Sequence, residues 1–225
     1  MLTIHHLENS RSQRILWLLE ELGIDYQINR YERDKKTSLA PLNLLAIHPL
    51  GKAPVITDGD LTVAESGAII EYLVNRYDDG RLMPAIGTPQ YMDYIYWIHY
   101  AEGTFMPLMI VSLIMSRIET APMPFFVRPI AKGIVSKVRA GYLSPNIKRN
   151  LEYINTTLGN STWFCGDELT AADIQMSFPV EAAEVRTTLD QAYPNIKSFL
   201  QRMRARPAYQ AALEKGGPYK LLGAD

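Results

Sequence analysis

The sequence predicts two domains of different fold class, an α/β domain followed by an all-helical one. Three observations predict this division. Strand-like segments occur only within residues 1–80, where they are interspersed with helical ones. Residues 81–89 are rich in glycine and proline and show no periodicity, which is typical of a linker. Across residues 90–225 apolar side chains recur at helical spacing and no strand-like alternation returns, which predicts a helical bundle.

The first domain opens with a predicted strand, helix and strand. Residues 2–6 alternate and form the first strand, and apolar residues recur at helical spacing over 15–22. Gly23 follows as the residue that ends the helix, and 24–31 form the second strand. Parallel pairing of two such strands requires a right-handed crossover through the helix, so this segment is a βαβ unit.

A short helix and a hairpin complete this domain. Residues 39–46 predict the helix. The segments 54–57 and 61–64 flank the polar turn 58–60 and predict the hairpin. Glu65-Ser66-Gly67 then opens a last helix. The predicted order of the domain is therefore βαβ-α-ββ-α.

Composition and charge argue against a nucleic-acid-binding, disulfide-bonded or membrane protein. The chain has 225 residues, 47% of them hydrophobic, and a net charge of −1, which gives no indication of nucleic-acid binding. The one cysteine, Cys165, cannot form an internal disulfide. No signal peptide is recognisable at the start, and the apolar run 105–115 is, at about eleven residues, too short for a bilayer. We therefore expect a cytoplasmic protein that contacts no membrane.

Several residues mark where helices of the second domain should start or break. Breaks are expected near Pro129 and Pro145. Thr170 and Asp173 have the spacing of a capping box, which predicts a helix that starts after Thr170 and that Pro179 should bend. The four histidines have no metal-ligand spacing, so no metal site is predicted.

The most suggestive polar cluster precedes the first helix. Asn9, Ser10 and Ser12 lie in the loop that leads into its N-terminus. Unpaired amides and the helix dipole favour an anion there, and a thiolate is such an anion. A hydroxyl that donates to the sulfur would stabilise it further. Ser10 is the first candidate for this role, with Asn9 and Ser12 as the alternatives. Ordinary helix capping would also explain all three.

Two further segments fit an extended peptide ligand. A cis bond before Pro54 would turn the backbone of Ala53 outward for strand-like pairing, and Lys52 beside it could meet a carboxylate. At the start of the last helix of the first domain, Ser66 and the free amides could hold a carboxylate and Glu65 an ammonium group. Taken alone, each segment is also explained by a turn or a helix cap.

Together these segments resemble the glutathione transferases. Residues 10–16 look like the serine-type active-site loop, 50–54 like the cis-proline segment, and 64–69 like the γ-glutamyl site. Residues 166–173 resemble the capping box of the helical domain of that family. The resemblance covers nearly the whole chain and is closest to the bacterial and fungal serine-type branch of the cytosolic enzymes.

The resemblance implies a thioredoxin-like first domain and assigns roles to matching residues. Ser10 would stabilise the glutathione thiolate, and Ala53 would pair with the cysteinyl backbone. Lys52 would approach the glycyl carboxylate, and Glu65 and Ser66 would hold the γ-glutamyl end. Glutathione is then a co-substrate, and no cofactor is expected.

The same resemblance implies a second pocket and a partner. An apolar pocket for the electrophile is expected between the domains, with Phe105, Met106 and Met109 as candidate lining residues, although plain core packing is an equal alternative for these three. A homodimer is expected. Two other functions fit the same residues, a glutathione-dependent disulfide reductase or peroxidase and a non-catalytic glutathione-binding regulator. A glutathione-dependent isomerase is disfavoured because the loop lacks a Ser-Ser-Cys sequence.

Overall fold

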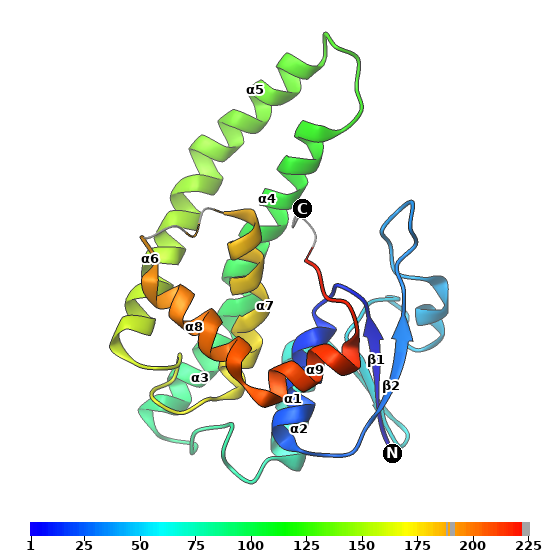
Figure 1. Cartoon of the computed structure of the whole chain (residues 1–225), viewed down its shortest axis with the longest axis vertical. Coiled ribbons are helices and arrows are strands. Elements are labelled where there is room, and N and C mark those ends of the chain that lie inside the picture. Colours follow the sequence, from blue (N-terminus) through cyan, green and yellow to red (C-terminus); the bar gives the residue numbers. More distant parts are fainter. Residues whose placement is uncertain (188, 190–191, 222–225) are drawn as a thin grey trace.

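The computed structural model describes residues 1–187, 189 and 192–221, and its first domain is built on a mixed four-stranded sheet. The strand order is β2-β1-β3-β4, and Figure 1 shows β1 and β2 side by side. β1 and β2 are parallel, whereas β3 is antiparallel to both of its neighbours. The strands are β1 (Leu2–Leu7), β2 (Gln27–Tyr31), β3 (Val55–Asp58) and β4 (Leu61–Ala64). The predicted βαβ-α-ββ-α order and the thioredoxin-like domain are thus confirmed.

Two of the predicted elements are shorter than expected. The second strand starts at Gln27, because Gln27 is the first residue that pairs with β1, opposite Thr3. The helix expected over 39–46 is a 3₁₀ helix, η1 (Leu42–Ala46), that starts after Pro41. Pro41 itself is extended, and a proline also disfavours the helical conformation in the residue before it.

Helix α1 (Ser12–Leu22) is enclosed on nearly all sides. It contacts β1 and α2 (Ser66–Tyr77) of its own domain, and α7 (Ala171–Arg186) and α9 (Pro207–Gly216) of the helical part (Figure 1). Gly23 ends α1 with a φ of 66°, as the sequence predicts. The residues at the start of α1 are therefore held between the two parts of the chain.

The helical part follows α2 and contains the remaining helices. α2 ends at Tyr77 and α3 begins at Pro89, while the domain boundaries 1–80, 81–89 and 90–225 stay predictions, with 222–225 outside the described residues. α4 and α5 form a long hairpin that projects from the body (Figure 1). The helices are α3 (Pro89–Tyr100), α4 (Met106–Thr120), α5 (Arg128–Val138), α6 (Ser144–Asn160), α7, α8 (Pro194–Ala205) and α9.

Two prolines are accommodated by widened helical turns. A π-helical turn, η2 (Ala101–Phe105), precedes Pro107, and a second, η3 (Arg139–Leu143), precedes Pro145. A wider turn avoids the clash of a proline ring with the carbonyl one turn earlier. The break expected near Pro145 is therefore a π turn, whereas Pro129 lies in the first turn of α5.

The helical segment Pro89–Thr120 runs without interruption through α3, η2 and α4. By length and composition alone it could cross a membrane, with 32 residues and a mean hydropathy of 1.3 in its most apolar window. This helix is much longer than the apolar run considered in the sequence. It also packs against α7, and 44% of that window is buried.

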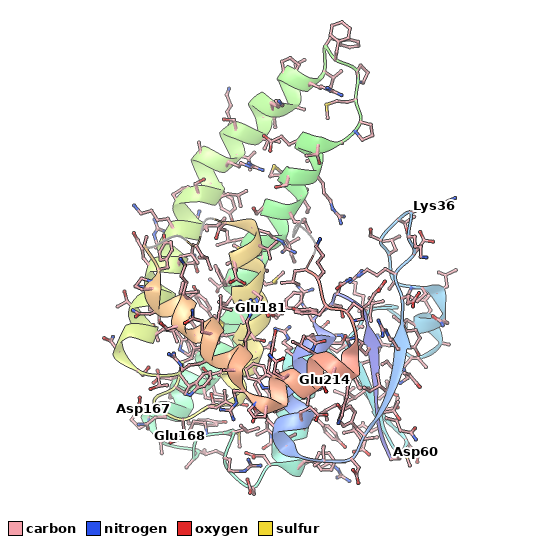
Figure 2. All side chains as sticks on the ribbon, viewed as in Figure 1. Lys36, Asp60, Asp167, Glu168, Glu181 and Glu214 are labelled. Atoms are coloured by element: carbon pink, nitrogen blue, oxygen red, sulfur yellow. The ribbon has the colours of Figure 1, made fainter. Side chains whose placement is uncertain are left out.

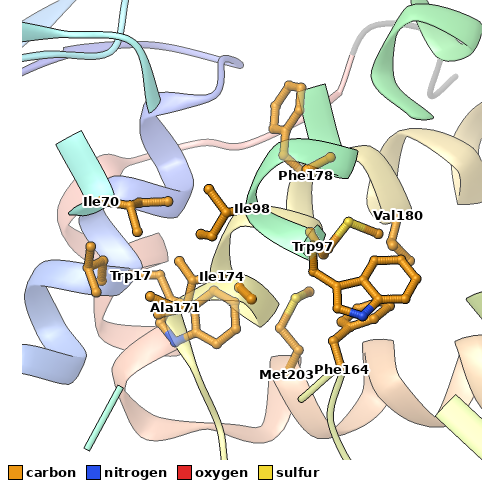
Figure 3. Packing of buried hydrophobic residues seen from close by; sticks show 14 of the residues in the cluster. Trp17, Ile70, Trp97, Ile98, Phe164, Ala171, Ile174, Phe178, Val180 and Met203 are labelled. Carbon is orange, nitrogen blue, oxygen red and sulfur yellow. The ribbon is translucent and has the colours of Figure 1, made fainter. Parts of the chain in front are cut away.

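Aromatic side chains form the centre of the helical domain. Trp97 of α3 packs on Phe164 with ring centroids 4.6 Å apart, and Phe164 meets Phe199 of α8 at 5.2 Å. Figure 3 shows Trp97, Phe164 and Met203 packed together, with Phe178 of α7 at the edge of the group and pointing away from it. Phe178 is therefore placed to face a different part of the molecule.

The capping box at the start of α7 is present. The Asp173 carboxylate accepts hydrogen bonds from the Thr170 amide at 2.8 Å and the Thr170 hydroxyl at 3.0 Å. Its other oxygen accepts from the Phe164 amide at 2.8 Å. Asp173 thus fixes both the helix and the loop before it, and α7 continues through Pro179.

The segment after α9 is tied back to α7. Glu181 is buried and its carboxylate accepts hydrogen bonds from Tyr209 at 2.6 Å and Tyr219 at 2.9 Å. Figure 2 shows Glu181 on α7, toward the middle of the molecule. This anchor leads the chain to Lys220, whose amide donates to Asn9 Oδ1 at 2.5 Å. The C-terminal segment therefore reaches the loop between β1 and α1.

Candidate active site

The loop between β1 and α1 is held by its own hydroxyl groups. The Ser10 and Ser12 hydroxyls donate to the Leu7 carbonyl at 2.8 and 3.1 Å and lie 2.8 Å from each other. Ser12 is fully buried, and its oxygen is 2.8 Å from His6 Nδ1. Asn9 adopts a φ of 51°, which turns the chain from the strand into the helix. The loop is thus rigid, with Ser12 behind it.

A cavity of about 540 Å³ opens in front of this loop. Asn9 and Ser10 line it, whereas Ser12 does not. Its other walls come from the segment before β3, from α4 and α7, and from the C-terminal segment at Leu221. The cavity therefore lies between the two domains, where the sequence predicts a substrate pocket.

A smaller cavity of about 270 Å³ adjoins the first. The five residues predicted to bind glutathione all line it, although they come from two separate segments of the chain: Lys52, Ala53, Pro54, Glu65 and Ser66. The two cavities share lining residues, including Arg11, Lys52 and Ala53. A ligand that crosses from one cavity to the other would therefore pass these residues.

Both segments contain uncommon backbone conformations, of which the cis bond was expected. The Ala53–Pro54 bond is cis. Glu65 has a φ of 72°, an uncommon value for a residue that is not glycine. This conformation places Ser66, which is buried, at the start of α2, where the first amides of the helix have no partner within it. The site can therefore offer amide donors to a carboxylate.

Three charged side chains connect the loop to the helical domain. Arg11 Nε donates to Glu102 of η2 at 3.0 Å, and Arg14 donates to the same carboxylate and to the Gln175 carbonyl at 2.6 Å. Burial opposes ionisation of Glu102, but the charges of Arg14 and Arg11 outweigh it and hold the pKa of the carboxyl below its usual range. Arg11 also lies over the Phe178 ring, 5.4 Å from its centroid. Both domains thus hold Arg11 at the junction of the cavities.

Arg11 and Glu102 were not predicted from the sequence as residues of the site. Arg11 follows Ser10 directly, so the active-site loop itself was the available signal. Nothing in the sequence pairs Glu102 with residues some ninety positions earlier, because they meet only when α1 and η2 both pack against α7.

The apolar wall of the larger cavity differs in part from the predicted one. Met106 lines the cavity, together with Ile110 and Leu113 one and two turns further along α4. Phe105 and Met109 are fully buried and do not line it. The helical period could have indicated Ile110 and Leu113, because residues 106, 110 and 113 share one face of the helix. Phe178 of α7 closes the wall opposite.

Two other features bear on the chemistry. Burial raises the pKa of the Cys165 thiol to about 12, and Cys165 lines neither of these cavities. Within the described residues, no group of three or more histidine, cysteine or acidic side chains could hold a metal ion. Besides the charged residues already named, Arg33 and Arg186 line the larger cavity and His48 lines the smaller one.

Comparison with known proteins identifies the family. Residues 3–75 match the glutathione S-transferase N-terminal domain and residues 114–207 the C-terminal domain. Glutathione S-transferase 3 of Schizosaccharomyces pombe is 36% identical over 96% of this chain and 88% of the relative. Glutathione S-transferase 1 of Saccharomyces cerevisiae is 30% identical over 100% of this chain and 98% of the relative.

A solved structure agrees with this assignment. The glutathione S-transferase from Actinobacillus pleuropneumoniae superposes with a TM-score of 0.82 and 36% identity, over 96% of this chain and 93% of that one. The similarity thus extends through both domains. The chain belongs to the glutathione S-transferase family.

Proposed function

We propose that this protein conjugates the thiolate of glutathione to small hydrophobic electrophiles. Glutathione occupies the smaller cavity, with its sulfur at the junction, and the electrophile enters the larger one. The observation that carries the proposal is the pair of adjoining cavities that share Arg11, Lys52 and Ala53. Such an arrangement holds two reactants in mutual contact, which is a large part of the rate advantage of an enzyme.

Both ends of glutathione and its cysteinyl backbone have a partner in the smaller cavity. Lys52 attracts the glycyl carboxylate, and Ala53 pairs with the backbone of the cysteinyl residue, beside Pro54. Ser66 and the first amides of α2 hold the γ-glutamyl carboxylate, and Glu65 holds its ammonium group. The presence of all five residues on one cavity wall supports these roles.

Ser10 is the proposed thiolate-stabilising residue, with Asn9 and Ser12 as alternatives. Ser10 and Asn9 line the larger cavity, near the N-terminus of α1, whereas Ser12 is bonded to His6 behind them. A rotation of the Ser10 hydroxyl away from the Leu7 carbonyl would direct its hydrogen to the sulfur. Met106, Ile110, Leu113 and Phe178 form the wall for the apolar part of the electrophile, with Phe105 and Met109 supporting it from the core.

We further propose a homodimeric, cytosolic enzyme of the serine-type bacterial and fungal branch that uses no cofactor. The Ser10-containing loop supports the serine-type assignment. Exposed Met92 and Tyr96 on α3 and Tyr153 on α6 offer apolar surface for a second copy. Light scattering at micromolar concentration tests this assembly, and a monomeric mass would contradict it.

The experiment that tests the function compares two reactions at equal glutathione concentration. One is conjugation of a neutral chloronitroarene, and the other is reduction of a mixed disulfide of glutathione. Conjugation well above the uncatalysed rate, with little reduction, is the expected result. The reverse preference would replace the transferase by a reductase, and glutathione binding without either reaction would indicate a regulatory protein.

A further inference from the structure

The larger cavity has a polar wall of one charge only. Among the described residues that line it, four carry a positive charge and none is aspartate or glutamate. The four come from the β1–α1 loop, the segment after β2, the segment before β3 and α7: Arg11, Arg33, Lys52 and Arg186. A cavity built only for neutral hydrophobic electrophiles has no need of such a wall.

We infer that the preferred second substrate carries a carboxylate on the same apolar body that bears its electrophilic carbon. This inference rests on the proposed function and specifies its substrate class. The guanidinium group suits the role because its fork of donors matches the two oxygens of a carboxylate.

Glutathione alone does not account for these cations. In the proposed binding mode its glycyl carboxylate meets Lys52, and its other carboxylate lies at Ser66 in the smaller cavity. Arg11 is paired with Glu102 at the junction, beside the sulfur. Arg33 and Arg186 line the larger cavity but not the smaller one, and Arg186 also donates to the Met109 carbonyl at 3.4 Å.

Arg33 is held in place by backbone carbonyls. Its guanidinium donates to the carbonyls of Glu8 at 3.2 Å, Asn9 at 3.3 Å and Ser38 at 2.9 Å. The Glu8 carboxylate accepts the Arg33 backbone amide at 2.8 Å and does not line the cavity. Arg33 is therefore a fixed, half-buried cation at the wall, and little conformational freedom would be lost when it binds an anion.

The like charges around the cavity affect one another. Burial lowers the pKa of both Arg33 and Arg186. For Arg33 the Glu8 carboxylate opposes this shift, whereas the nearby charges of Arg117 and Arg11 lower the pKa of both arginines further. A bound anion would relieve this mutual repulsion, and the partly enclosed position limits screening by salt. The remaining walls, formed by Met106, Ile110, Leu113 and Phe178, suit an aromatic or aliphatic body.

A matched pair of substrates tests the inference. In 4-chloro-3-nitrobenzoate and 4-chloro-3-nitrobenzamide the thiolate attacks the carbon that bears chlorine, a C–S bond forms, chloride leaves with the bonding pair, and the thiol proton passes to solvent. For each substrate, kcat/KM is divided by the uncatalysed rate constant with glutathione, which removes the difference in intrinsic reactivity. We expect this ratio to be about tenfold larger for the benzoate, and raised salt to reduce the difference only in part because the site is partly enclosed.

Two arginine variants locate the effect. Arg33→Gln should lower the benzoate ratio about tenfold and change the benzamide ratio less than twofold. The matched control is Lys36→Gln, which removes a positive charge from the outer tip of the adjoining loop, away from the cavity (Figure 2). Because Arg33 also supports three carbonyls, Arg186→Gln on a different element provides a second variant with the same expected selectivity.

A binding measurement makes the test independent of turnover. Calorimetry compares the two product conjugates, S-aryl glutathiones that carry either the carboxylate or the carboxamide. Tighter binding of the carboxylate, lost in both arginine variants, is expected. Equal ratios and equal affinities overturn the inference while conjugation of the benzamide leaves the proposed function intact. Absence of glutathione binding and of both reactions overturns the proposed function, and the inference with it.

Discussion

Replacing Glu102 by glutamine should weaken the junction between the two domains. The carboxylate of Glu102 bonds Arg14, whose side chain is 1% exposed, and Arg11, which is 31% exposed. The amide keeps the shape and one acceptor oxygen but removes the charge. Arg14 is then left with the Gln175 carbonyl and no counter-charge. A buried cation without its partner is the main cost of the substitution.

The magnitude follows from burial. Breaking a buried ion pair costs about 3–5 kcal/mol, but Glu102 is 33% exposed, so solvent screens part of the interaction. We therefore expect the free energy of unfolding to fall by about 2 kcal/mol, or the Tm by about 4–8 °C for a chain of this size. Urea denaturation and calorimetric melting at pH 7 measure both quantities.

The matched control for this prediction is Glu119→Gln. Glu119 is 32% exposed, nearly the same as Glu102, but its partner Arg139 is 39% exposed rather than buried. An exposed pair of this kind contributes about 0.5 kcal/mol or less. Equal losses in the two variants, or a loss below about 0.5 kcal/mol for Glu102→Gln, would refute the reasoning from burial.

The pH dependence gives a second signature. The arginines hold the pKa of Glu102 below its unfolded value. The stabilisation is therefore complete above the unfolded pKa and is lost as the pH falls through the folded pKa. The stability difference between wild type and Glu102→Gln should shrink in acid below about pH 4. A difference that stays constant down to pH 3 would contradict this assignment.

Three further predictions concern stability and reactivity. Thr170→Ala removes a hydroxyl that donates to Asp173 and should cost about 1 kcal/mol; an unchanged melting temperature would contradict it. Burial lowers the pKa of His6 to about 4, so the folded state binds fewer protons than the unfolded state between pH 6.5 and 4, and about 3 kcal/mol of stability is lost over that range. His6→Gln should flatten this acid limb in urea titrations, and parallel curves would rule out His6 as its source. Cys165, with its thiol pKa raised to about 12, should react with a thiol reagent at pH 8 only after unfolding, and rapid labelling of the native protein would contradict its burial.

The local elements of the fold could be read from the sequence. Gly23 ends α1 in the left-handed conformation, the bond before Pro54 is cis, and Thr170 with Asp173 caps α7. Each of these features depends on interactions within a few residues of the chain, which is why a motif can predict it. The exact start of β2 could not be read, because Gln27 is paired only through the register of β1.

The site was predictable to the extent that short motifs compose it. The five residues expected to bind glutathione line one cavity because each motif fixes its own backbone. The sequence did not reveal the roles of Arg11, Glu102 and Arg33. Arg11 meets Glu102 only because α1 and η2 both pack against α7, and Arg33 reaches the same cavity from the segment after β2. Met106 lines the cavity whereas Phe105 and Met109 lie in the core, a difference that depends on the packing of α4 and on the π turn before it.

The central claim is that glutathione binds in the smaller cavity with its thiol ionised at the start of α1. Calorimetric titration with glutathione, combined with ultraviolet absorbance of the thiolate, tests it most directly in wild type and Ser10→Ala, with Ser198→Ala on α8 as the control. We expect binding in all three proteins and a bound thiol pKa about 1–2 units higher in Ser10→Ala alone. An unchanged thiolate in Ser10→Ala would move the role to Asn9 or Ser12, and no binding at millimolar glutathione would contradict the account.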